Sequence, residues 1–190
     1  MNSAWAIQDG VVPSMIQLST VLWLAIFTFG VIGYLRGFDK ELVALSGIVL
    51  ALFTLVQFNT FFESLTDTAG NPGRSLWYLQ TIILLVVTFF AYQTPPEKFE
   101  NIMRRRGGRD KFQTQILGMI TGAFNGYLVF GSIWYFLHVK GYPLTSILPP
   151  APDSASAGLA DNLPLDWLLQ GNLLTLLVIG LFLFILIAVI

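Results

Sequence analysis

Five uncharged stretches divide this 190-residue chain, and each is long enough to cross a lipid bilayer. Crossing the hydrocarbon core takes about 20 apolar residues. The charged residues lie in the short connectors between these stretches. The pattern therefore predicts an all-α integral membrane protein built as a bundle of about five transmembrane helices. The expected spans cover, approximately, residues 16–35, 42–62, 76–92, 116–139 and 167–190.

The composition agrees with this class of protein. Hydrophobic residues make up 55% of the chain and charged residues 11%, whereas about a quarter of the residues in soluble domains are charged. No hydrophilic stretch is long enough to form a separate domain outside the membrane, so any function belongs to the bundle. We expect three parts: a four-helix membrane region at 1–139, an external loop at 140–166 and a fifth transmembrane helix at 167–190.

Basic residues indicate the orientation of the bundle. The first and third connectors hold eight Lys and Arg residues, whereas the second and fourth hold only Arg74 and Lys140. Connectors rich in Lys and Arg stay on the cytoplasmic side. The distribution predicts a multi-pass protein with its N-terminus outside and its C-terminus inside.

The third connector carries a basic cluster, made up of Arg104, Arg105, Arg106, Arg109 and Lys111. Anionic lipid attracts such residues by about 1 kcal/mol each near the surface, so a short amphipathic segment here could rest on lipid or dock a partner. The alternative is that the cluster only fixes the orientation. An Arg-Gly-Gly-Arg run without interleaved aromatic residues falls short of a nucleic-acid footprint. We expect no nucleic-acid partner.

The fourth connector, residues 141–164, is rich in Pro, Ala, Ser and Gly. Such a composition does not bury enough apolar surface to fold alone. We expect an extended external loop that is ordered only where another chain covers it. The expected partners are therefore the lipid bilayer and either further copies of this chain or other membrane subunits.

Small residues recur where helices are expected to touch. In lipid, helices associate through close backbone approach, which Gly and Ala at four-residue spacing allow. The fourth span has such a row, with Thr121 and Asn125 on the adjoining stripe. These faces either knit one bundle together or join copies of the chain. The candidate helix-packing residues are Gly33, Gly37, Ala44, Gly47, Ala51, Gly118, Gly122 and Gly126.

Residue types that carry chemistry are scarce. Proton relays and ion-coupled transporters use ionisable groups at membrane depth, and the middles of the expected spans contain none. There is no cysteine, no Ser/His/Asp set and no phosphate-binding glycine loop. We therefore expect no catalytic residue, no metal and no cofactor. His138 offers one ligand for a porphyrin-type pigment, but a lone histidine beside Trp134 and Tyr135 is more typical of an aromatic belt.

Two motifs resemble the colicin V production (CvpA-like) membrane family over about residues 16–139. The first, Gly33-Tyr-Leu-Arg-Gly-Phe-Asp-Lys-Glu41, has an Arg-Gly pair after the first span and an acidic residue before the second. The second, Asp110-Lys-Phe-Gln-Thr-Gln-Ile-Leu-Gly118, leads into the glycine row of the fourth span. Lys111 replaces the usual Arg, Asn125 stands where the family has an Arg, and a fifth span follows the family pattern of four.

The resemblance implies a non-catalytic protein of the bacterial inner membrane that supports toxin production or export, or envelope physiology. The alternative is an accessory scaffolding subunit of a larger respiratory or photosynthetic complex, which the added span and the uncovered loop favour. Arg36 and Asp110 are expected at the cytoplasmic ends of the first and fourth spans. We hypothesise that these two side chains form an ion pair that locks the bundle.

Overall fold

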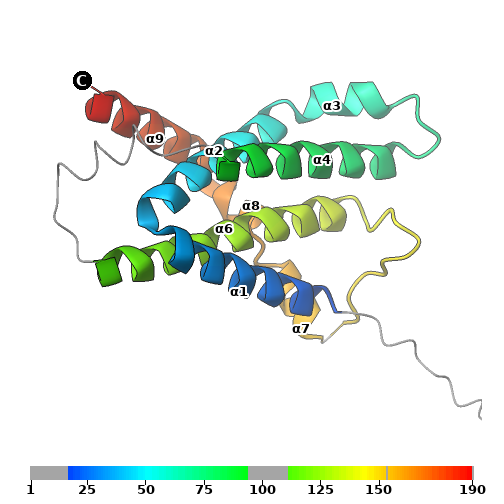
Figure 1. Ribbon diagram of the computed structural model, residues 1–190. Coiled ribbons are helices and arrows are strands. Elements are labelled where there is room, and N and C mark those ends of the chain that lie inside the picture. Colours follow the sequence, from blue (N-terminus) through cyan, green and yellow to red (C-terminus); the bar gives the residue numbers. More distant parts are fainter. Residues whose placement is uncertain (1–16, 94–110, 153, 190) are drawn as a thin grey trace, which may run out of the picture.

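The computed structural model describes residues 17–93, 111–152 and 154–189, and these residues form helices and connecting loops without a strand (Figure 1). The chain is therefore an all-α membrane protein. The elements are α1 (Leu18–Arg36), α2 (Phe38–Gln57), α3 (Asn59–Thr66), α4 (Pro72–Gln93), α6 (Lys111–Val139), α7 (Ala155–Ala160), α8 (Pro164–Leu168), the 3₁₀ turn η1 (Gln170–Asn172) and α9 (Leu173–Val189).

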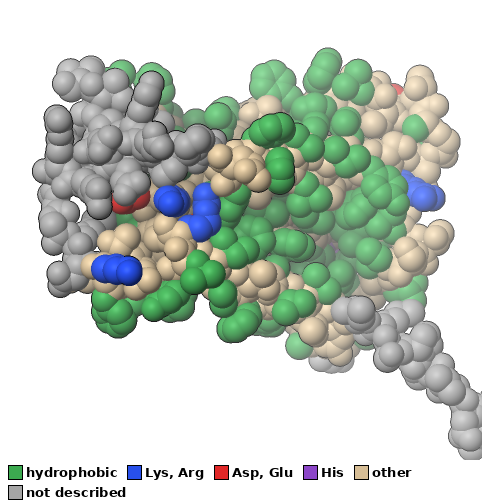
Figure 2. All heavy atoms as spheres, viewed as in Figure 1, with side chains coloured by type: hydrophobic (Ala, Val, Ile, Leu, Met, Phe, Trp, Pro, Cys, Tyr) green, Lys and Arg blue, Asp and Glu red, His purple; other side chains and the backbone are tan. Residues whose placement is uncertain are grey.

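Three helices, α1, α4 and α6, are each long and apolar enough to cross a membrane. The pair α2 and α3, and the segment from α7 through α9, qualify as bent spans, which raises the number of spans to as many as five among the described residues. Figure 2 shows hydrophobic side chains across the middle of one face and Lys and Arg side chains toward its two ends. This distribution suits a bundle whose middle lies in lipid.

The second span, expected over about 42–62, is covered by α2 and α3 and is bent. The chain bends by 64° between α2 and α3, at Phe58, whose backbone (φ −100°, ψ 19°) is not helical. Beyond the bend, Gln80 Nε2 of α4 donates to Asn59 Oδ1 at 3.0 Å. The side-chain amides thus hold α3 against α4 instead of letting it continue the axis of α2.

The fifth span is also interrupted. Pro164 begins α8, and the carboxylate of Asp166 accepts the backbone N–H of Leu163 at 2.9 Å, which is typical of a helix start. The fifth span, expected over 167–190, is bent near its start, because Gly171 takes a left-handed backbone conformation (φ 60°) and the helices on either side differ in direction by 47°. Glycine adopts this conformation without the steric cost of a side chain.

We expected the fourth connector to be an extended loop, but parts of it are helical. It contains α7 and α8, and Leu163 and Leu165 are fully buried. Ser156 of α7 donates to the hydroxyl of Ser19 on α1 at 2.9 Å. The composition does not reveal that this segment packs on helices of its own chain.

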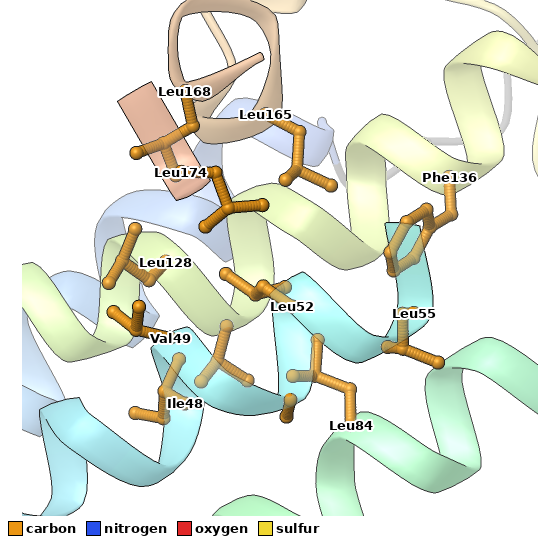
Figure 3. Close-up of a cluster of buried hydrophobic side chains, with 12 residues drawn as sticks. Ile48, Val49, Leu52, Leu55, Leu84, Leu128, Phe136, Leu165, Leu168 and Leu174 are labelled. Atoms are coloured by element: carbon orange, nitrogen blue, oxygen red, sulfur yellow. The ribbon is translucent and has the colours of Figure 1, made fainter. Parts of the chain in front are cut away.

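The hydrophobic core lies where α2, α4, α6 and α8 meet, and Figure 3 shows Leu165, Leu168 and Leu174 approaching Leu52 and Leu128. The core side chains are aliphatic with few exceptions, so packing rather than polar chemistry holds this end of α8 in place.

Candidate functional site

A buried carboxylate marks the candidate site. Glu41 lies in the first turn of α2, and its exposed fraction is 0%. The charge pattern had placed this residue in a connector, but the structure places it inside the bundle. A charged group removed from water is costly unless it is paired and hydrogen-bonded, so its partners decide what the site can do.

Three helices supply partners to the carboxylate. Arg36 of α1 donates from Nη1 to Glu41 Oε1 at 2.6 Å. On the other oxygen, Oε2, the hydroxyl of Tyr92 on α4 donates at 2.8 Å and Nδ2 of Asn125 on α6 donates at 2.9 Å. We call these four residues the Glu41 cluster. The charge of Glu41 is thus balanced by one cation and satisfied by neutral donors.

Arg36 is fixed in turn by Tyr92. Its Nη2 donates to the backbone carbonyl of Tyr92 at 2.9 Å, and the guanidinium carbon lies 4.4 Å from the centroid of the Tyr92 ring. A cation over an aromatic face adds to the attraction. The Arg36 side chain is 20% exposed and Tyr92 is partly exposed, so these two residues form the outer side of the cluster within the described part of the chain.

The local backbone explains why these residues meet. Gly37 joins α1 to α2 with a positive φ of 83°, and its N–H bonds to the carbonyl of Gly33 at 2.8 Å. This tight turn brings Arg36 next to Glu41. On α2, an added Cβ on Gly47 would lie only 2.7 Å from the Cβ of Ala91 on α4, so the absence of a side chain lets α4 come close enough for Tyr92 to reach the carboxylate.

Asn125 contributes a donor without a charge. Besides the bond to the carboxylate, Nδ2 donates to the backbone carbonyl of Glu41 at 3.2 Å. Its Oδ1 is buried and has no hydrogen-bond partner among the described residues. The amide therefore binds α6 to the start of α2 while keeping one acceptor free, and it leaves Arg36 as the one cation of the cluster.

The predicted pair of Arg36 with Asp110 stays a prediction. Asp110 lies outside the described residues, as do Arg104, Arg105, Arg106 and Arg109 of the basic cluster. Lys111, which is described, begins α6 and is exposed. The structure assigns Arg36 a different acceptor, Glu41, which precedes the second span and was quoted above only as part of a motif.

The candidate helix-packing residues fall into two groups. The first group lies where α1 and α6 run side by side (Figure 1). It consists of Gly33, Gly37, Gly118, Gly122 and Gly126. An added Cβ on Gly33 would overlap the carbonyl of Gly118. The other three lie on α2, where Ala44 and Ala51 are buried and Gly47 faces α4. Both groups bring together helices of one chain.

His138 lies near the other end of α6, away from the Glu41 cluster. Its Nδ1 is 3.1 Å from the hydroxyl of Tyr142, which also accepts the indole N–H of Trp134 at 3.1 Å. The described residues contain no group of three or more His, Cys, Asp or Glu side chains that could hold a metal ion. The histidine is thus part of an aromatic and hydroxyl cluster.

Sequence reasoning missed Glu41 and Tyr92 as members of one site. The signal for Glu41 was present, because an acidic residue directly before an apolar span follows the Arg-Gly pair by a few positions. No comparable signal marks Tyr92, since aromatic residues are common at the ends of membrane spans. Only the contact of α2 with α4 shows what its hydroxyl binds.

Comparison with known proteins identifies the region that contains this site. A family model described as Colicin V production protein matches residues 18–163, which is more than half of the chain and includes all four residues of the Glu41 cluster. The range ends just before α8, so α8 and α9 lie outside it. No curated protein matches the chain, and no solved structure matches it.

Proposed function

We propose that this chain, which belongs to the Colicin V production protein family, is a non-catalytic protein of the bacterial inner membrane that supports the production or export of a colicin V-like toxin. The observation that carries the proposal is the family match over residues 18–163. The all-helical bundle, with three to five possible spans among the described residues, is compatible with this role.

Within this role, the Glu41 cluster sets the shape of the bundle. It ties the ends of α1 and α4 and the start of α2 to the middle of α6 through charged and neutral hydrogen bonds. A membrane protein without chemistry of its own acts by presenting a fixed surface or by changing between arrangements. The cluster is the element that would fix one arrangement.

A complementation experiment tests the proposal. Deleting the gene from a strain that secretes a colicin V-like toxin is expected to lower the secreted toxin, and the wild-type chain is expected to restore it. Glu41→Gln should restore less, because the amide loses the ion pair with Arg36. The measurement is toxin in the medium relative to toxin in the cells, at equal membrane levels of each variant.

The control is Asp67→Asn, which removes one negative charge at an exposed position and should restore secretion fully. Unchanged secretion in the deletion strain, together with sensitivity to detergents, would move the role from toxin export to envelope physiology and overturn the proposal. If Glu41→Gln restored secretion as well as the wild-type chain, the Glu41 cluster would have no part in the proposed function.

The proposed orientation places the N-terminus outside and the C-terminus inside. Its support is the distribution of Lys and Arg among the connectors. Because the chain has no cysteine, Gly70→Cys, in the connector between α3 and α4, gives a single thiol in open space. A membrane-impermeant maleimide added to spheroplasts should label it, whereas Lys111→Cys should react only after lysis. The reverse labelling pattern would show that the N-terminus lies inside and the C-terminus outside.

A second candidate function is an accessory subunit of a larger respiratory or photosynthetic complex. The observation that favours it is α9, which lies outside the family match and carries exposed apolar side chains, among them Leu176, Phe182 and Leu183. Purification from native membranes in mild detergent, with mass spectrometry of the same fraction, separates the two candidates. Stoichiometric co-purification with such a complex would favour the subunit, and a solitary or self-associated chain would favour the export role.

A further inference from the structure

Five buried side-chain atoms have no hydrogen-bond partner among the described residues, and all five lie on α4 and α6. They are Gln80 Oε1, Thr81 Oγ1, Thr88 Oγ1, Asn125 Oδ1 and Ser132 Oγ. Leaving so many polar atoms unpaired would cancel much of the free energy that keeps a typical domain folded. Something other than the described protein atoms must therefore satisfy them.

The helical repeat aligns four of these five residues in two rows, and Gln80 precedes Thr81 directly in the chain. Thr81 and Thr88 are seven residues apart on α4, and Asn125 and Ser132 are seven apart on α6. Residues at this spacing lie on one helix face, two turns apart. Each row is therefore a straight line of polar groups along its helix.

Two contacts show that the rows face each other. At one end, Asn125 Nδ2 donates to the hydroxyl of Tyr92 at 3.3 Å. At the other, the indole N–H of Trp77 donates to the carbonyl of Ile133 at 3.2 Å. Along α4, Thr81 and Thr88 lie between Trp77 and Tyr92, and along α6, Ser132 lies between Asn125 and Ile133. The two contacts thus flank the unpaired hydroxyls along both helices.

Polar groups continue beyond both ends of the rows. Asn125 belongs to the Glu41 cluster. At the opposite end, Gln80 donates to Asn59 of α3, and Asn59 Nδ2 donates to Glu63 Oε1 at 2.7 Å. Glu63 is exposed. Polar side chains therefore recur at intervals between the exposed Glu63 and the buried carboxylate of Glu41.

We propose that a file of buried water lies between α4 and α6, bonded to these five atoms, and gives Glu41 access to water from the Glu63 end of the bundle. Water is the ligand that fits, because hydroxyl groups both donate and accept and the amide oxygens accept. Buried waters bind otherwise unpaired polar groups with about three hydrogen bonds each. The fully buried Leu84 lies about 40° round α4 from Thr88 and about 60° from Thr81, so the file passes beside it.

Silver ion tests this proposal in the cysteine-free full-length chain. Ser132→Cys and Thr88→Cys each place one thiol in the rows with little change in size. Silver reacts with the thiolate, which forms readily only where water reaches the sulfur. Purified variants in detergent are exposed to silver nitrate for set times, quenched, denatured and labelled with a maleimide, so that the lost label reports the reaction.

Two matched variants serve as controls. Val129→Cys lies on α6 between the two row residues, is equally buried and belongs to the apolar core. Val86→Cys lies on the outer, exposed face of α4, where detergent covers it. We expect both row thiols to react at least about tenfold faster than either control, because ionisation of a thiol is suppressed in apolar surroundings.

Row thiols that react as slowly as Val129→Cys would overturn the proposal. Thr81→Cys provides a third position if either row variant elutes differently from the parent protein on size exclusion. The silver experiment does not depend on a role in toxin export. Slow reaction of the row thiols would contradict the water file alone, and a failed complementation would contradict the proposed function alone.

Discussion

Replacing Gly122 by leucine is expected to separate α1 from α6 and to unfold the bundle. A Cβ at this position would overlap the carbonyl of Phe29 and would lie 2.9 Å from the Cα of Gly33. Backbone atoms cannot rotate away as a side chain can, so α1 would have to move as a whole. Overpacking in a well-packed interior costs about 1–3 kcal/mol and occasionally more, and we expect the upper end or beyond.

The measurement is the thermal unfolding midpoint in mild detergent, followed by size exclusion. Gly180→Leu is the matched control, because a Cβ at Gly180 of α9 would meet nothing within 4 Å. We expect that variant to melt with the parent protein. A Gly122→Leu variant that also melted with the parent would show that the close packing of α1 on α6 does not support the fold.

Removing the cation of the Glu41 cluster should have the second large effect. In Arg36→Met, the fully buried Glu41 keeps its two neutral donors but loses its ion pair. An uncompensated buried charge costs about 3–5 kcal/mol. The free energy of unfolding, measured by titration with a denaturing detergent, is expected to fall by that amount.

Lys40→Met removes the same charge four residues further along the chain. Lys40 is partly exposed, and we expect its loss to cost less than about 1 kcal/mol, as for charges near the surface. Equal losses in the two variants would mean that net charge, and not the pairing with Glu41, accounts for the effect. A large loss in Arg36→Met alone assigns it to the buried pair.

The fold could be predicted from the sequence where one physical effect dominates. Uncharged stretches of membrane length identify α1, α4 and α6, because the cost of burying charge in lipid outweighs other preferences. The breaks at Phe58 and Gly171 could not be predicted. A single residue there changes the direction of the chain without changing its hydrophobicity, and the amide contact of Gln80 with Asn59 joins segments that are distant in the sequence.

The site could be predicted only in part for a similar reason. The Arg-Gly pair and the row from Gly118 to Gly126 are visible as motifs, and they do lie at one helix contact. The pairing of Arg36 with Glu41 was not predictable, because Asp110 and Glu41 are both acidic residues expected near the same membrane surface. Tertiary packing, through Gly37 and Gly47, decides that Glu41 is within reach.

The neutral amide of Asn125 also determines how the cluster responds to voltage. Arg36 and Glu41 carry opposite charges and lie together, so the four side chains have no net charge. A unit charge that crosses the whole membrane gains about 2.3 kcal/mol per 100 mV, but a neutral group gains almost nothing. An energised membrane therefore exerts little net force on this part of the bundle, and its arrangement should stay the same when the membrane potential collapses.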